Sequence, residues 1–162
     1  MTKAFFTGHR AINDRQTKAG INQLIDIALE QGVLHFFCGM AIGTDQLAAA
    51  ILVNRKLPWT AVIPCADQAK LWSQKNQEKY KKLLTYANQI IVLYPQYSPG
   101  VMQSRNLYMI ERSQLCLAIY DGRDRGGTKT TINLAIARNL SVIAFNPKLE
   151  KINRLPRQLS LF

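Results

Sequence analysis

The stretch VLHFFCGMAIGTD, residues 33–45, decides the fold class of this chain. Its first six residues, 33–38, form an apolar run that is too short and too aromatic for a helix and therefore predicts a strand. Gly39 and Gly43 follow at once, and a segment with helical periodicity, 47–52, comes next. A continuous apolar strand that passes through a glycine-rich turn into a helix is typical of a parallel sheet whose two faces are covered by helices.

The same alternation continues in both directions along the chain. Further apolar runs predict strands at residues 4–7, 60–64, 90–94, 115–120 and 141–145. Segments with helical periodicity separate them. The clearest follows Asn13, which can cap a helix, and ends at Gly32, where a left-handed C-terminal residue belongs. We therefore expect one α/β domain with a doubly wound, mostly parallel sheet.

The composition fits a single soluble domain. A chain of 162 residues matches the usual domain size of roughly 100–200 residues, and 48% hydrophobic residues support a sizeable core. No apolar run reaches the roughly 18 residues of a membrane helix, and the amino terminus lacks a signal-peptide core, so we expect a cytoplasmic protein without a membrane partner. The three cysteines have no C-x-x-C spacing, so the sequence predicts neither a disulfide framework nor a metal site.

The chain is strongly basic. Its 21 Lys and Arg residues against 10 Asp and Glu residues leave a formal net charge of +11. Such an excess favours a polyanionic partner, nucleic acid or a nucleotide. Residues 1–146 carry the periodic pattern and are assigned to the nucleotide-binding domain. Residues 147–162 lack strong periodicity and are assigned to a basic tail.

Three loops that follow predicted strands carry the residues for binding chemistry. They are Thr7–Arg10, Gly39–Asp45 and Asp121–Thr131. In a parallel sheet, ligands bind beyond the carboxyl ends of the strands. Glycines let the backbone approach a ligand, and free N–H groups of the following helix attract an anion. The loops therefore predict a phosphate-binding site; the alternative is that their glycines only form tight strand-to-helix turns.

Neither glycine-rich loop matches a standard nucleotide motif. The loop at 39–43 has the pattern G-x-x-x-G, not the G-x-G-x-x-G of dinucleotide-binding folds. The later loop is similar to a P-loop, but Thr128 is inserted before its lysine and it follows the fifth strand. No convincing acid for Mg²⁺ stands at a strand end. We therefore do not expect a motor-type ATPase.

The motifs taken together resemble a known family. They are Thr7-Gly8-His9-Arg10, the loop 39–45, the segment 64–86 with its Gln, Trp and later Tyr, Ser104-Arg105-Asn106, and Gly126-Gly127-Thr128. Across residues 3–146 the chain resembles the YpsA-like branch of the SLOG superfamily, which unites DNA-processing protein A with cytokinin-activating phosphoribohydrolases. The resemblance implies a Rossmann-like domain that binds a nucleotide, a nucleotide derivative or single-stranded DNA, and that forms a homo-oligomer.

The resemblance and the loops that carry it also assign the ligand-binding residues. These are Gly8, His9, Arg10, Gly39, Met40, Gly43, Asp45, Arg105, Asn106, Asp121, Gly126, Gly127 and Thr128. The only cofactor expected is a bound nucleotide or nucleotide derivative.

His9 and Asp45 are the candidates for acid–base catalysis. Each has an alternative role: a histidine beside a glycine turn can be a ligand contact or a structural hydrogen bonder, and Asp45 can bind a ribose hydroxyl or cap the next helix. His35, inside an apolar strand, is expected in the core. Phosphoribohydrolases of this superfamily have a glutamate three residues after a Gly-Thr pair, where this chain has Thr131. That difference removes the main argument for N-glycosidic hydrolysis.

The last five residues, Gln158, Leu159, Ser160, Leu161 and Phe162, resemble the peptide by which bacterial proteins bind the sliding clamp, the beta subunit of the replicative polymerase. A glutamine and two hydrophobic anchors occupy the motif positions. An apolar Leu-Phe pair is costly in water unless it is buried. The alternative is that this peptide docks on its own domain or across a dimer interface.

The sequence thus predicts a protein of bacterial or mobile-element DNA metabolism. We expect it to bind a nucleotide-type ligand or single-stranded DNA in the glycine-loop crevice, and the sliding clamp in DNA replication, without turnover. Two other classes of protein fit the same crevice. One is a sensor of a nucleotide signal, and the other is an enzyme that cleaves a nucleotide or nucleoside phosphate.

Overall fold

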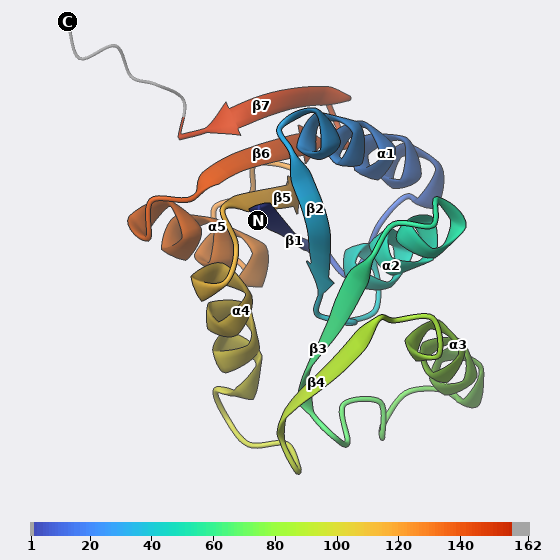
Figure 1. The fold of residues 1–162 in the computed structure, drawn as a ribbon. Helices are drawn as coiled ribbons and strands as arrows, with labels where there is room; N and C mark the ends of the chain where they lie inside the picture. The colour runs from blue at the N-terminus through green and yellow to red at the C-terminus, as the bar shows by residue number, and fades with distance from the viewer. Residues whose placement is uncertain (1, 157–162) are drawn as a thin grey trace, which may run out of the picture.

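A seven-stranded sheet forms the centre of the computed structural model, which describes residues 2–156 (Figure 1). The strand order is β4-β3-β2-β1-β5-β6-β7. The bounds are β1 (Thr2–Gly8), β2 (Val33–Cys38), β3 (Trp59–Cys65), β4 (Gln89–Tyr94), β5 (Leu115–Ile119), β6 (Ser141–Asn146) and β7 (Lys151–Leu155). The first six strands are parallel and β7 is antiparallel to β6. The prediction of a Rossmann-like, mostly parallel sheet is confirmed.

Helices cover both faces of the sheet. Figure 1 shows α1 (Asp14–Glu30), α2 (Thr44–Asn54) and α3 (Gln74–Leu84) on one face, and α4 (Val101–Glu111) and α5 (Gly127–Ala137) on the other. Successive strand residues point to opposite faces. Phe6 accordingly packs in the core beneath the first three helices, whereas Phe5 packs in the core beneath α4 and α5. Burial on both faces is why the strands are continuous apolar runs. None of the described helices is long and apolar enough to span a bilayer.

The caps of α1 match the sequence pattern. The side chain of Asn13 accepts a hydrogen bond from the backbone N–H of Gln16 at 3.2 Å. At the other end, Gly32 has a φ of +86°, the left-handed conformation that ends helices and that glycine adopts without steric cost.

β7 is a strand that the sequence pattern does not reveal. Residues 147–162 lack strong periodicity and are assigned from the sequence to a basic tail, yet Lys151–Leu155 pairs along β6 from Asn146 to Val142. Asn146 initiates the turn between the strands, because its Oδ1 accepts the N–H groups of Lys148 and Leu149. An edge strand that is only half-buried needs little apolar periodicity, which is why the pattern is weak. The clamp-like peptide 158–162 lies outside the described residues.

The strand order reverses at β1. From β1 the chain adds β2, β3 and β4 on one side, and then crosses over to add β5 and β6 on the other. The loops after β1 and β5 therefore diverge and leave a crevice beyond their carboxyl ends, where open α/β sheets bind ligands.

Gly20 tests how tightly α1 packs on the sheet. A Cβ at this position would lie 2.2 Å from Cδ1 of Phe145, a side chain that is 2% exposed. We expect Gly20→Ala to lower the free energy of unfolding by about 1–3 kcal/mol, the usual cost of overpacking, although alanine favours helix by about 1 kcal/mol. Urea denaturation measures the change. Gly127→Ala is the control, because its Cβ would meet no heavy atom within 4 Å; equal losses in both variants would contradict this packing.

Candidate phosphate-binding site

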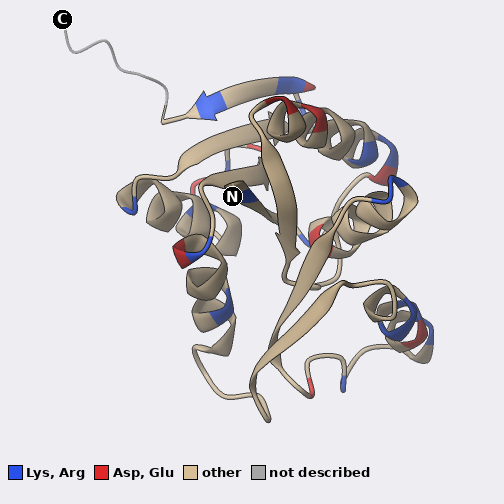
Figure 2. Cartoon of the chain, viewed as in Figure 1, with Lys and Arg blue, Asp and Glu red and all other residues tan. Residues whose placement is uncertain are grey.

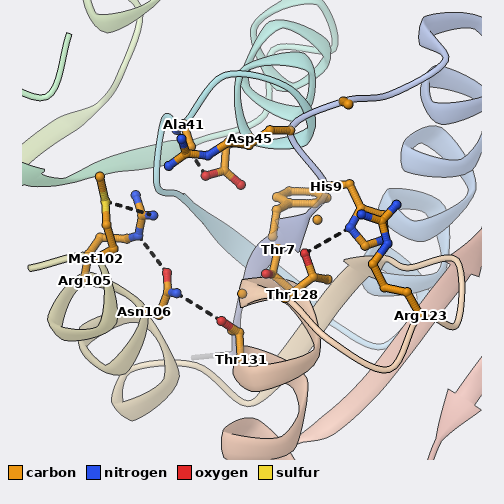
Figure 3. A pocket seen from close by; sticks show the side chains of 16 residues that line it. Thr7, His9, Ala41, Asp45, Met102, Arg105, Asn106, Arg123, Thr128 and Thr131 are labelled. Atoms are coloured by element: carbon orange, nitrogen blue, oxygen red, sulfur yellow. Dashed lines mark hydrogen bonds between the residues drawn. The ribbon is translucent and has the colours of Figure 1, made fainter. Parts of the chain in front are cut away.

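A cavity of about 410 Å³ lies at the predicted crevice, between the loop after β1 and the first turns of α2, α4 and α5 (Figure 3). Nine of the thirteen predicted binding residues line it: Gly8, His9, Arg10, Asp45, Arg105, Asn106, Gly126, Gly127 and Thr128. The remaining lining residues are Phe6, Thr7, Ala11, Ala41, Met102, Arg123 and Thr131. Of these, Thr7, Ala41, Arg123 and Thr131 lie within the three predicted loops, whereas Met102 belongs to no motif and gives no signal in the sequence.

The other four predicted residues support the cavity without lining it. The carbonyl oxygen of Gly39 accepts from Nη1 of Arg105, and that of Met40 accepts from the side chain of Gln46 at 3.2 Å. Gly43 packs on the backbone of the β1 loop, and Asp121 binds side chains behind the cavity wall.

Two glycines allow the β1 loop and the start of α2 to approach each other closely. A Cβ on Gly8 would lie 2.4 Å from Oγ1 of Thr44, and one on Gly43 would lie 2.4 Å from the carbonyl oxygen of Arg10. Gly43 also has a φ of +98°. Both the N–H and the hydroxyl of Thr44 donate to the carbonyl oxygen of His9, at 3.1 and 2.9 Å. This N–H at the start of α2 is therefore already used within the protein and is not free for an anion.

The amino terminus of α5 is open by contrast. Gly126 caps it without a side-chain hydrogen bond. Among residues 2–156, no acceptor contacts the N–H groups of Gly127, Thr128 and Lys129, and the first two of these residues line the cavity. Unused N–H groups at a helix start attract anions. Of the two helix starts beside the crevice, α5 is the better equipped to hold a phosphate, because its first three N–H groups are free within the described chain, whereas α2 uses the N–H of Thr44 within the protein and carries the carboxylate of Asp45 in its first turn.

Arg105 brings a buried positive charge to the cavity. The residue is 5% exposed, and its Nε donates to Oδ1 of Asn106 at 2.7 Å while Nη2 meets only the sulfur of Met102 at 3.9 Å. No carboxylate of the described chain comes within 4.0 Å of the guanidinium. Burial lowers the pKa of Arg105, and the attraction of Asp45 partly opposes that effect. A buried charge without a contacting counter-ion favours an anionic ligand.

Asp45 supplies the carboxylate among the lining residues. It stands in the first turn of α2, is 8% exposed, and accepts the N–H of Ala41 at 3.2 Å through Oδ2. It thus holds the glycine loop closed and does not cap the helix, where Gly43 takes that position. Burial raises the pKa of Asp45, and the charges of Arg105 and Arg10 oppose the shift. Its Oδ1 accepts no hydrogen bond from the described chain.

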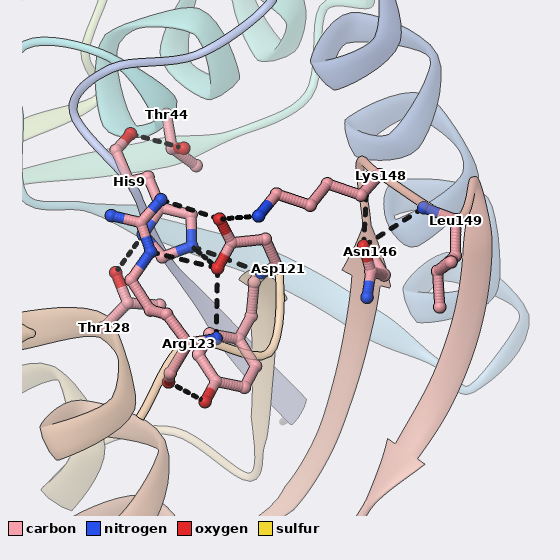
Figure 4. Close-up of polar contacts among 9 residues, drawn as sticks. His9, Thr44, Asp121, Arg123, Thr128, Asn146, Lys148 and Leu149 are labelled. Atoms are coloured by element: carbon pink, nitrogen blue, oxygen red, sulfur yellow. Dashed lines mark hydrogen bonds and ion pairs between the residues drawn. The ribbon is translucent and has the colours of Figure 1, made fainter. Parts of the chain in front are cut away.

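His9 is held at both ring nitrogens (Figure 4). Nε2 lies 3.2 Å from the N–H of Asp121 and 3.3 Å from its Oδ1, and Nδ1 lies 3.5 Å from the hydroxyl of Thr128. Burial, followed by the charge of Arg123, lowers the pKa of His9. The imidazole is therefore neutral near pH 7 and connects the β1 loop, the β5 loop and α5. These contacts favour the structural role over the acid–base role.

Asp121 neutralises the cations beside His9. Arg123 donates to its carboxylate through Nε at 3.0 Å and Nη2 at 2.7 Å, and Nζ of Lys148 lies 3.7 Å away. The hydrogen bonds from Arg123 hold the pKa of Asp121 well below its usual range. Arg123 thus enters the cavity wall with its charge compensated, which leaves Arg105 and Arg10 as the uncompensated cations of this cavity.

Thr131, where the phosphoribohydrolases have a glutamate, also lines the cavity. Its hydroxyl accepts from the side-chain amide of Asn106 at 3.0 Å. That bond fixes Asn106, which in turn accepts from Arg105.

His35 lies away from the cavity, and its placement differs from the expectation of a core residue. It is half-buried, and its Nε2 is 2.7 Å from Oγ1 of Thr60. Burial lowers its pKa. All three cysteines are buried and unpaired. No cluster of three metal-binding side chains occurs within residues 2–156.

This fold and this cavity define a Rossmann-like domain with a crevice at the point where its strand order reverses. The chain belongs to the YpsA family, because the model described as the YspA SLOG family matches residues 8–143. It is 32% identical over 127 residues to the uncharacterized SPbeta prophage-derived protein YoqJ of Bacillus subtilis, covering 68% of this chain and 74% of that protein. It is 28% identical over 125 residues to a UPF0398 protein of Bacillus licheniformis, covering 73% of this chain and 68% of that protein.

Solved structures of DNA processing protein A share the fold. The protein from Streptococcus pneumoniae superposes with a TM-score of 0.64 at 19% identity, over 88% of this chain and 50% of that one. The protein from Helicobacter pylori, described with a unique single-stranded DNA binding mode, superposes with a TM-score of 0.67 at 17% identity. The match covers 88% of this chain and 64% of that one. This chain therefore spans half of the first and under two thirds of the second.

The lowered pKa of His9 predicts a pH dependence of stability. The unfolded chain takes up a proton at His9 near pH 6.5, before the folded state does, so the contribution of His9 to the free energy of unfolding falls as the pH falls below about 6.5. We expect His9→Gln to reduce this loss, measured as the change in unfolding midpoint between pH 7.5 and 5. His35→Gln should remove a separate part of this pH-dependent loss of stability, because the pKa of His35 is also lowered. The protonation of Asp121 changes the stability only below about pH 4, outside the measured range. An unchanged slope in His9→Gln would refute the assignment.

Proposed function

We propose that the cavity binds the phosphate of a nucleotide, either free or as one unit of single-stranded DNA, and that the protein acts in bacterial or mobile-element DNA metabolism. The observation that carries this proposal is the guanidinium of Arg105, buried at the cavity without a contacting carboxylate. A guanidinium presents planar donors that match a phosphate, and its charge needs an anion when water is excluded.

The remaining contacts fit the same ligand. The open N–H groups at the start of α5 can hold the phosphate from one side, while Arg105 approaches from α4. Arg10, an exposed lining residue, adds a second positive charge at the cavity mouth. The volume of about 410 Å³ falls within the range of small-ligand sites, roughly 300–1,000 Å³. Oδ1 of Asp45 is available for a sugar hydroxyl.

Binding without turnover agrees with how the two catalytic candidates are engaged. Asp45 holds the N–H of Ala41, and both nitrogens of His9 have partners. The site is thus organised to hold a phosphate in a fixed environment. The +11 net charge extends the attraction beyond the cavity, as expected for a protein that meets nucleic acid.

Charge removal at Arg10 tests this site. We expect Arg10→Gln to weaken binding of a fluorescent 20-nucleotide single strand, or of ATP, at least about tenfold, which corresponds to 1.4 kcal/mol. Fluorescence anisotropy measures the first and calorimetry the second. Arg55→Gln is the matched control: it removes the same charge from the pair that Arg55 makes with Asp26, away from the cavity. Arg105→Lys should also weaken binding, because lysine lacks the guanidinium fork.

The two ligands are distinguished by salt. Binding of single-stranded DNA should weaken steeply as salt rises, since each phosphate contact releases a counterion. A free nucleotide should bind with a shallow dependence. Equal losses in Arg10→Gln and Arg55→Gln would show that the attraction is only nonspecific charge and would overturn the site.

We propose as a second function that residues 158–162 bind the bacterial sliding clamp. The support is the sequence Gln158-Leu159-Ser160-Leu161-Phe162, in which a glutamine and two apolar anchors have the spacing of the clamp-binding peptide.

Deletion tests the clamp proposal. The full chain should bind purified bacterial clamp in surface plasmon resonance, and a version without residues 158–162 should not. The deletion variant should bind nucleotide as the full chain does, since the cavity is built from other residues. Clamp binding that survives the deletion, or no binding by either protein, would reject this function while leaving the cavity proposal in place.

A further inference from the structure

A long uncharged segment surrounds one edge of the sheet. The chain is 19% charged, yet no Asp, Glu, Lys or Arg occurs from residue 83 to residue 104. This segment contains β4, the outermost strand on its side of the sheet. Figure 2 shows β4 and the loop after it free of the charges that mark the helices and the opposite edge. Most residues from 85 to 100 are exposed, so the uncharged segment forms part of the protein surface.

β4 exposes a row of apolar side chains. Ile90, Val92 and Tyr94 are 47%, 48% and 42% exposed. They alternate along the strand and are in register with Ala61, Ile63 and Cys65 of β3, whose side chains are buried. The row therefore lies on the same face of the sheet as α1–α3, beyond the cover that α3 provides. Within residues 2–156, no strand pairs with the outer side of β4.

The other edge of the sheet is protected by charge. β7 carries Lys151 and Arg154, both exposed, and Pro156 follows it. Charged residues and proline at an edge prevent further strands from pairing with it. β4 has neither between Gln89 and Tyr94. One edge is thus closed to pairing, and the other retains the free backbone groups and apolar side chains that pairing requires.

We propose that β4 pairs with β4 of a second copy of this chain, antiparallel about a two-fold axis at Val92. Two chains of charge +11 repel each other, so a stable contact between them requires a neutral surface. A two-fold interface must also complement itself, which an uncharged strand edge does. With the axis at Val92, Ile90 lies opposite Tyr94 of the second copy on the same face. Aromatic and β-branched residues are favourable cross-strand partners.

A charge at the axis tests the pairing. We expect the wild-type protein to be a dimer by sedimentation velocity at about 50 μM, a dimer that salt strengthens by screening the net charge. Val92→Lys should be monomeric, because it places two like charges directly opposite each other. Leu71→Lys is the control, since Leu71 is 94% exposed and lies off β4; it should remain dimeric. Circular dichroism melts establish that both variants are folded.

A cysteine at the axis tests the register without adding charge. Residues directly opposite in an antiparallel pair have Cβ atoms about 4.5–5.5 Å apart, close to the separation in a disulfide. Val92→Cys should form a disulfide-linked dimer on mild oxidation, whereas Leu71→Cys should not, and the three native cysteines are buried. A monomeric wild type, a dimer that survives Val92→Lys, or a Val92→Cys dimer that does not cross-link would each overturn the proposal.

Discussion

The site depends on one guanidinium and on the residue that leaves room for it. Arg105 reaches from α4 to the carbonyl oxygen of Gly39 at the end of β2, and a Cβ on Gly39 would lie 2.4 Å from its Nη1. The glycine is therefore required by the arginine. Through Asn106 the same side chain is linked to Thr131 of α5, and its charge acts on Asp45 of α2. Three helices are thus arranged around a single buried cation.

The distribution of charge around this cation is uneven. Asp121 neutralises Arg123 and contacts His9 and Lys148, so the basic residues on that side attract little. Arg105 has no equivalent carboxylate in contact. The positive potential is therefore concentrated beside the open start of α5, where a phosphate gains both a charge and N–H donors. The chain is basic throughout, and this position combines an uncompensated charge with free N–H donors.

Much of the fold could be predicted, because buried parallel strands impose continuous apolar runs that the sequence shows directly. β7 could not, since a charged edge strand such as Lys151–Leu155 has little pattern and is identified only by its partner β6. At the site, the loops were predictable from their glycines. The direction of each side chain was not: Asp121 turns behind the wall, and Met40 turns into the core. Met102 reaches the cavity only because α4 crosses the sheet there.

Because β7 runs antiparallel to β6, it returns the chain to the opposite end of the sheet. β6 runs toward the cavity, where Lys148 contacts Asp121, and β7 then runs back, so that Leu155 lies beside Val142 near the amino ends of the parallel strands (Figure 1). Leu155, the last residue of β7, therefore lies at the end of the sheet opposite the cavity. The two binding functions proposed above would therefore use opposite ends of the sheet.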